Sequence, residues 1–261
     1  MLHTILWDWN GTLLDDVEVA LAAMNEMLAR RGLPLLRGRE PYRDIFTFPV
    51  REYYTAAGLD LSAEPFESLA VEWTGLYHRF YPRCGLFPAV RGVLQAVGEM
   101  GLEQAIVSAS HQQALDSQVE EQGLGGFFQA RLGISDIYAG SKAGLAQRYL
   151  KSQGVPPQQA LFVGDTLHDW EVAQEAGAPA CCCPRATKAA PAWKPPVSPC
   201  WRASPRCRRF CGACKLNPAG NKKDAPPQKP RVPYHPSGCR MLRRLFFMLA
   251  FKCFDKYQIK S

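Results

Sequence analysis

The order of apolar and polar positions predicts a buried strand at the start of the chain. The apolar run Ile5-Leu6-Trp7 ends in Asp8, and the turn residues Gly11-Thr12 follow three residues later. Such a run is typical of a strand in a parallel sheet that brings its last polar residue to the edge where ligands of open α/β sheets bind. A helical pattern comes next, because apolar residues recur at intervals of three and four, at Val17, Ala20, Leu21, Met24, Met27 and Leu28.

Residues 15–83 carry only helical patterns. Further helices are predicted at 48–57 and 65–81, and no strand pattern interrupts them. Beyond this region, strands are predicted at 104–107, 130–134 and 160–163, and helices at 91–100, 112–122, 142–153 and 169–176. Because repeated strand–helix units build parallel sheets, the sequence predicts an α/β fold with a doubly wound parallel sheet and an inserted α-helical cap.

The charge and cysteine distributions change abruptly near Pro184. Residues 185–261 hold 18 Lys and Arg against 2 Asp and Glu, a net charge of +16, so the +7 of the whole chain leaves −9 for residues 1–184. Of the 10 cysteines, only Cys84 precedes Cys181. We therefore predict a core of residues 1–14 and 84–184, a helical cap of residues 15–83, and a basic, Pro- and Cys-rich tail of residues 185–261.

The tail has the composition of a disordered segment, since residues 184–236 contain 12 prolines and almost no aliphatic periodicity. The spacing of Cys207, Cys211 and Cys214 suggests zinc, but two paired Cys-x-x-Cys units are absent. The basic charge comes without a recognition motif, so no nucleic-acid partner is expected. Residues 241–254 suit a membrane-surface or packing helix and are too short to span a bilayer. A reading-frame change near residue 180 would explain the abrupt switch, and the genomic DNA tests that hypothesis.

The part before the tail is typical of a cytoplasmic protein. The predicted strand begins almost at Met1, so we expect no secretory signal. No apolar run reaches the roughly 18–20 residues of a transmembrane helix. An acidic part with one cysteine suits a reducing compartment.

Four polar clusters follow the predicted strands: Asp8-x-Asn10-Gly-Thr12, Ser108-Ala-Ser110, Lys142, and Gly164-Asp165-Thr166-x-x-Asp169. Because parallel strands end at one edge of a sheet, these clusters are expected to converge. Facing carboxylates repel, and a hard divalent cation such as Mg²⁺ resolves that repulsion. A lysine, a hydroxyl and backbone N–H groups beside them suit a bound phosphate. Lys142 is the first lysine of the chain, which favours a role in the site over simple solvation.

These residues resemble the motifs of the haloacid dehalogenase (HAD) superfamily, and within it the phosphoglycolate-phosphatase-like branch. The matching segments are WDWNGTLLDD, LFPAVRGVLQAV, AIVSAS, SDIYAGSK and FVGDTLHDWEVAQEAGAP, in order within residues 1–183. The resemblance implies Mg²⁺-dependent hydrolysis of a small phosphate monoester through an aspartyl-phosphate, a chemistry for which an aspartate is a competent nucleophile.

By this resemblance, Asp8 would be the nucleophile and would also bind Mg²⁺ through its second carboxylate oxygen. The backbone carbonyl of Asn10 and the carboxylate of Asp165 would be further metal ligands, and Asp169 would bind directly or through water. Lys142 would hold Asp8 and the phosphate in place. The predicted catalytic set is thus Asp8, Asn10, Ser108 and Lys142, and the predicted substrate-binding residues are Thr12, Ser108, Ala109, Lys142 and Arg43, of which Arg43 would read a substrate carboxylate from the cap.

Asn10 departs from the family pattern, in which this position is usually an aspartate that serves as general acid and base. A neutral amide cannot usefully exchange a proton near pH 7, and such help is typically worth about 10²–10⁴-fold in rate. Three interpretations stay open: slow turnover or a good leaving group, substitution by His111, Asp15 or Asp16, and phosphate binding without turnover. If the proton is simply missing, replacing Asn10 by Asp accelerates esters with poor leaving groups.

Other chemistries of the superfamily fit this sequence less well. Phosphonate hydrolases use a lysine of the cap, and the cap of this chain has none. Haloacid dehalogenases need no metal, whereas Asp165 and Asp169 keep the metal-site pattern. The rival to an enzyme is a catalytically weak or inactive phosphate-binding or regulatory protein. The aromatic residues and arginines of segment 43–54 are interpreted either as substrate contacts or as the small core of the cap.

Overall fold

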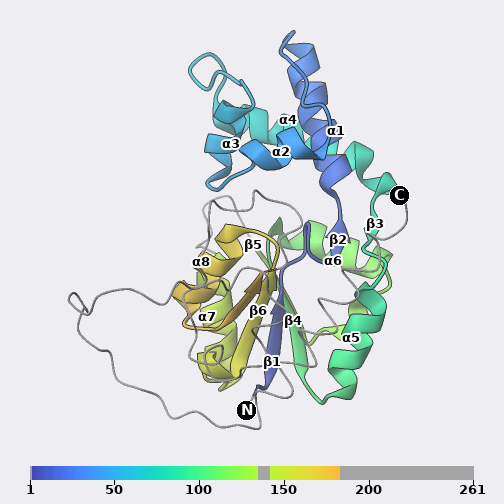
Figure 1. Ribbon diagram of the computed structural model, residues 1–261, viewed down its shortest axis with the longest axis vertical. Helices are drawn as coiled ribbons and strands as arrows, with labels where there is room; N and C mark the ends of the chain where they lie inside the picture. Colours follow the sequence, from blue (N-terminus) through green and yellow to red (C-terminus); the bar gives the residue numbers. More distant parts are fainter. Residues whose placement is uncertain (1, 135–141, 183–261) are drawn as a thin grey trace, which may run out of the picture. The chain divides into compact units, whose positions relative to one another are not determined.

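A five-stranded parallel sheet forms the centre of the fold (Figure 1). The computed structural model describes residues 2–134 and 142–182. The strands follow the order β5-β4-β1-β6-β7, with the bounds β1 (Thr4–Trp7), β4 (Glu103–His111), β5 (Ala130–Ile134), β6 (Ala160–Gly164) and β7 (Ala180–Cys182). All neighbouring pairs are parallel, and the first strand is the central one. This arrangement confirms the predicted doubly wound α/β fold.

Helices cover both faces of this sheet. They are α5 (Val90–Glu99), α6 (Gln112–Glu121), α7 (Lys142–Ser152) and α8 (Leu167–Ala176). Helices α7 and α8 share one face (Figure 1), where they pack on Leu6, Val107 and Phe162 of the strands. Helices α5 and α6 contact β4 from the other face, as right-handed crossovers require.

Four further helices between β1 and β4 build a separate apolar core. They are α1 (Val17–Arg30), α2 (Arg39–Ile45), α3 (Val50–Ala56) and α4 (Phe66–Phe80). Their buried residues, among them Met24, Tyr53 and Leu69, form one cluster. The short antiparallel pair β2 (Leu14–Asp15) and β3 (Gly85–Leu86) joins these helices to the sheet. Three 3-10 helices complete the described elements, at Tyr81–Arg83, Gly125–Phe127 and Pro157–Gln159.

The burial of β1 determines where Asp8 lies. Residues Thr4–Trp7 are at most 1% exposed, and Trp7 is in register with Ile106 of β4 and Val163 of β6. The backbone N–H of Asp8 donates to the carbonyl of Val163 at 2.8 Å, so Asp8 directly continues the central strand. The strand itself, and not a solvent-exposed loop, therefore holds the carboxylate of Asp8 at the C-terminal edge of the sheet.

Several predictions concern residues outside the described part of the chain. These are the disorder, the zinc-type cysteines and the apolar segment 241–254 of the tail, together with residues 135–141 of the SDIYAGSK segment. The exact division into core, cap and tail likewise stays a prediction. Within residues 2–134 and 142–182, no helix is both long and apolar enough to cross a membrane.

Candidate active site

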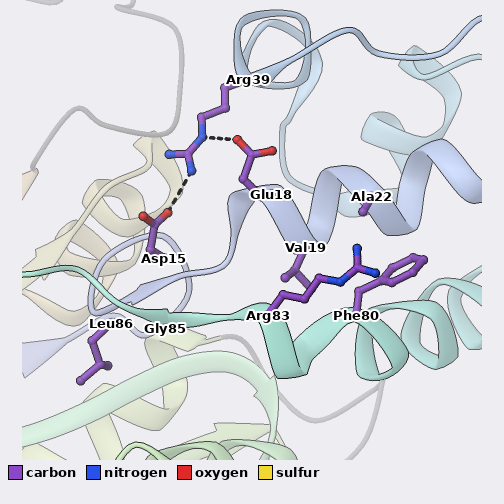
Figure 2. Close-up of a pocket in the computed structure, with 9 residues that line it drawn as sticks. All are labelled: Asp15, Glu18, Val19, Ala22, Arg39, Phe80, Arg83, Gly85 and Leu86. Atoms are coloured by element: carbon purple, nitrogen blue, oxygen red, sulfur yellow. Dashed lines mark hydrogen bonds and ion pairs between the residues drawn. The ribbon is translucent and has the colours of Figure 1, made fainter.

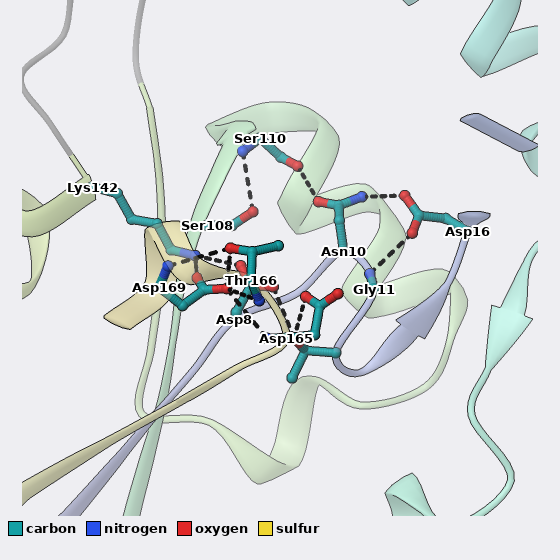
Figure 3. Close-up of polar contacts among 11 residues, drawn as sticks. Asp8, Asn10, Gly11, Asp16, Ser108, Ser110, Lys142, Asp165, Thr166 and Asp169 are labelled. Atoms are coloured by element: carbon teal, nitrogen blue, oxygen red, sulfur yellow. Dashed lines mark hydrogen bonds and ion pairs between the residues drawn. The ribbon is translucent and has the colours of Figure 1, made fainter. Parts of the chain in front are cut away.

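Three buried carboxylates meet at the C-terminal edge of the sheet (Figure 3). Asp8 follows β1, Asp165 follows β6, and Asp169 lies in the first turn of α8. One carboxylate oxygen of each lies within 4.8 Å of the others, and none of the three residues is more than 6% exposed. Because Asp8 is more than 150 positions from the other two in the sequence, only the parallel topology of the sheet brings the three together.

Lys142, at the start of α7, neutralises part of this negative charge. Its ammonium donates to Asp8 and to Oδ1 of Asp169, the latter at 2.6 Å. Burial alone lowers the pKa of Lys142, but Asp8 and Asp169 outweigh burial and raise it above its usual value. The lysine is therefore charged at all relevant pH values and acts as a fixed positive partner for the carboxylates.

The pKa values of the three carboxylates move in different directions. Burial and the neighbouring charge of Asp169 raise the pKa of Asp8 to about 7, against the opposing effect of Lys142. Burial, Asp8 and Asp169 raise the pKa of Asp165 well above its usual range. Burial also acts on Asp169, but Lys142 and the donors of Thr166 hold its pKa below the usual value. Lys142 thus favours the ionised form of Asp169, whereas burial and like charge oppose ionisation of Asp8 and Asp165.

Asp169 has a structural role besides its place in the cluster. Its Oδ2 accepts from the backbone N–H and hydroxyl of Thr166, at 3.0 and 2.7 Å, and the Thr166 hydroxyl accepts from the N–H of Asp169 at 3.3 Å. This reciprocal pair is a capping box at the N-terminus of α8. Because the cap uses Oδ2 and Lys142 uses Oδ1, Asp169 has fewer free lone pairs for a cation than Asp8 or Asp165.

The donor set fits a divalent cation. Oδ2 of Asp165 is buried and has no hydrogen-bond partner among the described residues, although a buried carboxylate oxygen normally has one. A Cβ on Gly11, whose φ is +74°, would lie 2.7 Å from this oxygen, so glycine keeps the space beside it open. The Thr12 hydroxyl lies 2.9 Å from Asp8 and 3.0 Å from the other oxygen of Asp165. Clustered oxygen ligands are those that Mg²⁺ prefers.

An irregularity in β4 presents two serines to this edge. Val107 pairs with Leu132 and His111 with Ile134, so the intervening residues of β4 outnumber those of β5. Within the irregular stretch, the buried Ser108 hydroxyl accepts from the backbone N–H of Ser110 at 3.0 Å, and Ala109 is exposed. The irregular hydrogen bonding between β4 and β5 therefore shapes the segment 108–110, which the sequence predicts to bind phosphate.

Asn10 lies in a network that the sequence only partly indicated. Its side-chain N–H group donates to Asp16 at 2.7 Å, and its carbonyl oxygen accepts from the Ser110 hydroxyl at 2.7 Å (Figure 3). The N–H group also lies 3.2 Å from the Tyr77 hydroxyl, to which it donates. Of the three residues considered as substitutes for an aspartate, Asp16 is the one that contacts Asn10. Asp15 instead pairs with Arg39, and His111 is exposed at the start of α6.

The aromatic residues of segment 43–54 contact one another. Phe46 stacks on Tyr42 at 5.3 Å and meets Tyr53 at 5.2 Å between ring centroids. Phe48 instead stacks on His168 of α8 at 4.3 Å, which joins the cap segment to the element that carries Asp169. Of the two arginines, Arg51 lies over Phe66 and pairs with Glu67, and Arg43 is 3.7 Å from Glu40.

A hollow of about 450 Å³ lies beside the β2–β3 connection (Figure 2). Its wall includes Arg39, which pairs with Glu18 at 2.6 Å and with Asp15 at 3.4 Å. Phe80 and Arg83 line it from the end of the insert, with the Arg83 guanidinium 5.3 Å from the Phe80 ring. None of the three clustered aspartates lines it, so we place the candidate site at the sheet edge.

An aspartate directly after the central strand of a parallel sheet, with a lysine and two aspartates from later elements beside it, is the arrangement that the HAD-type motifs predicted. The chain belongs to the haloacid dehalogenase-like hydrolase family, which it matches over residues 5–183, more than half of its length. This match confirms the family to which the sequence motifs pointed.

Named relatives support the phosphatase branch. The phosphoglycolate phosphatase of Pseudomonas syringae pv. tomato is 32% identical over 182 residues, which are 66% of this chain and 66% of that protein, just under two thirds of each. The N-acetylmuramic acid 6-phosphate phosphatase of Pseudomonas putida is 29% identical over 67% of this chain and 80% of that protein. The crystal structure of CbbY from Rhodobacter sphaeroides in complex with phosphate shares the fold, with a TM-score of 0.59, 19% identity, and coverage of 73% of this chain and 90% of that one.

Proposed function

We propose that the protein hydrolyses a small phosphate monoester with Mg²⁺ through an aspartyl-phosphate on Asp8. The observation that carries this proposal is the buried cluster of Asp8, Lys142, Asp165 and Asp169 at the edge of the sheet. In the first step, a carboxylate oxygen of Asp8 attacks phosphorus, the bond from phosphorus to the ester oxygen breaks, and the ester oxygen leaves as an alkoxide or phenoxide that takes its proton from water. In the second step, water attacks phosphorus and releases inorganic phosphate and free Asp8.

Apart from Asp8, the residues of this site position the phosphoryl group and neutralise its charge. Lys142 contacts Asp8 and carries the positive charge that phosphoryl oxygens need. We assign hydrogen bonds to the phosphoryl oxygens to Ser108 and Thr12, and a backbone N–H contact to Ala109. Ser108 is 1% exposed, so a hydrogen bond from its hydroxyl forms away from competing water.

Asp8, Asp165 and the backbone carbonyl of Asn10 would hold the cation, with Asp169 direct or through water. When bound, Mg²⁺ supplies neutralisation of the phosphoryl charge and of the carboxylates. The partnerless Oδ2 of Asp165, among the described residues, and the open space beside Gly11 support this assignment.

Asn10 restricts the leaving groups that this site handles well. Its amide is not acidic enough to protonate the departing oxygen near pH 7, so esters whose alcohols leave without protonation are favoured over alkyl esters. We therefore expect an aryl phosphate to turn over faster than an alkyl phosphate of similar size.

The substrate class follows from the relatives and from the cap. Phosphoglycolate and N-acetylmuramic acid 6-phosphate, which the relatives' names specify, are small phosphorylated metabolites. Each carries a carboxylate besides the phosphate, and Arg43 is our candidate for that group because its buried Nε has no hydrogen-bond partner among the described residues. A cytoplasmic location, predicted from the cysteine distribution, would give access to such metabolites.

Phosphate release tests the proposal. The full chain is incubated with 4-nitrophenyl phosphate, phosphoglycolate and N-acetylmuramic acid 6-phosphate, each with Mg²⁺ and with EDTA. Asp8→Asn removes the nucleophile, and Asp60→Asn, an exposed aspartate of the insert, is the matched control. We expect Mg²⁺-dependent release by the wild type and by Asp60→Asn only. Equal rates for wild type and Asp8→Asn would contradict the enzyme and favour the non-catalytic phosphate-binding alternative.

A further inference from the structure

The side chain of Asp16 points back toward the loop that carries the nucleophile. Asp16 is the residue that precedes α1, a position where an aspartate usually caps the helix with its own carboxylate. Here it makes no such cap. Its Oδ1 instead accepts from the backbone N–H of Gly11 at 3.0 Å, and its Oδ2 accepts from Asn10 at 2.7 Å.

The same carboxylate connects the loop to the insert. The Tyr77 hydroxyl of α4 donates to Oδ2 of Asp16 at 2.8 Å and accepts from the Asn10 amide at 3.2 Å. Asp16 and Tyr77 are each 6% exposed, so these bonds form away from solvent. Within the described part of the chain, the donors around Asp16 are the Asn10 amide, the Tyr77 phenol and backbone N–H groups, all of them neutral, so hydrogen bonds and not an ion pair balance its charge.

This arrangement explains why position 10 holds an amide. An aspartate there would bring a second carboxylate to the 2.7 Å contact now made by the Asn10 N–H group, and two carboxylates at that distance repel. On the other side, the Ser110 hydroxyl donates to the Asn10 carbonyl, which orients the amide with its N–H group toward Asp16. Position 10 therefore holds the amide, and position 16 holds the carboxylate.

We propose that Asp16 and Tyr77 are positioning residues that hold the Asn10–Gly11 segment beside Asp8, and that the carboxylate and the amide of positions 10 and 16 are exchangeable as a pair. This inference rests on the proposed phosphatase function for its kinetic part. It assigns no contact with substrate to Asp16. It replaces the expectation that Asn10→Asp alone accelerates the reaction, because that substitution by itself places two carboxylates in contact.

A double-mutant cycle tests the exchange. Wild type, Asn10→Asp, Asp16→Asn and the double variant Asn10→Asp/Asp16→Asn are compared at pH 7.5 with Mg²⁺, by kcat and KM for 4-nitrophenyl phosphate and by the unfolding midpoint. Coupling between contacting residues typically changes such constants by about two- to a hundredfold. We expect Asn10→Asp alone to lower kcat at least tenfold and to lower the midpoint, and the double variant to recover both.

Removal of the Tyr77 hydroxyl tests the link between Asp16 and the helical insert. Tyr77→Phe removes the bond to Asp16 and should lower kcat about tenfold with KM changed less than twofold, as loss of a hydrogen bond to a charged group predicts. Tyr53→Phe is the matched control, because Tyr53 is as buried in the insert and its hydroxyl has no hydrogen-bond partner among the described residues.

Three results would overturn the inference. These are additive effects of the two single substitutions on the midpoint, an Asn10→Asp variant as fast and stable as the double variant, and equal kinetics of Tyr77→Phe and Tyr53→Phe. Absence of Mg²⁺-dependent phosphate release by the wild type would instead overturn the proposed function. The unfolding midpoints need no activity and would still decide the pairing of Asn10 with Asp16.

Discussion

Replacing Asp8 by Asn should remove catalysis and, without metal at pH 8, stabilise the protein. Burial and Asp169 raise the pKa of Asp8 from 3.8 to about 7. Between these pH values the folded state keeps a proton that the unfolded state has released, so stability falls as pH rises from 4 to 7. This rise in pKa lowers the free energy of unfolding by about 4 kcal/mol, and the loss is complete above pH 7. The amide that the variant carries at position 8 cannot ionise and therefore avoids the loss.

Thermal unfolding in EDTA at pH 5 and pH 8 measures this difference. Of this loss, about 3 kcal/mol falls between pH 5 and pH 8, because the pKa of Asp8 lies about two units above pH 5. In a domain of this size 1 kcal/mol shifts the midpoint by about 2–4 °C, so the wild-type midpoint should fall by about 6–12 °C more than that of Asp8→Asn. The other titrating groups are common to both proteins, so the difference between the two pH responses reports Asp8 together with its effect on the pKa values of Asp165 and Lys142. Mg²⁺ added at pH 8 should raise the wild-type midpoint more than the variant's. Equal pH responses of the two proteins would refute the reasoning.

Three further substitutions or modifications have defined outcomes. Gly11→Ala should lower the free energy of unfolding by about 1–3 kcal/mol and also lower Mg²⁺ affinity, because the added Cβ would meet Asp165. Gly58→Ala, also at positive φ but in open space, should keep the Mg²⁺ affinity of the wild type. Calorimetric titration with Mg²⁺ distinguishes the two variants. Thr166→Ala should cost about 1 kcal/mol in urea unfolding through loss of the α8 capping box. Cys84, whose pKa burial raises to about 12, should resist alkylation at pH 8 in the folded protein and react after urea is added, as mass spectrometry of its peptide would show.

The strand-end carboxylates were predictable because each follows an apolar run. The run before Asp8 and the run before Asp165 are β1 and β6, and the topology of a doubly wound sheet is enough to bring their ends together. Helix α2 was not predicted because Tyr42 is the one buried residue among its seven. A single buried position gives no apolar period, whereas α3, which is equally short, buries both Tyr53 and Tyr54.

The partners of Asn10 were less accessible to sequence reasoning. Helical periodicity places Tyr77 on the apolar face of α4, and most of its ring does pack in the core of the insert. No local pattern indicates that its hydroxyl meets Asp16, 61 positions earlier. The contact depends on how α4 packs against α1, which the spacing of apolar residues does not specify.

The segment Asp165-Thr166-x-x-Asp169 shows why a motif alone does not assign its residues. A threonine followed three residues later by an acidic residue is also the signal of a helix N-cap, and Asp169 completes that capping box. The same side chain gives its other oxygen to Lys142 at 2.6 Å, whereas Asp165 keeps a buried oxygen without a partner among the described residues. Asp165 is therefore the better candidate for a direct cation ligand, and Asp169 for the residue that orients Lys142 and meets the cation through water.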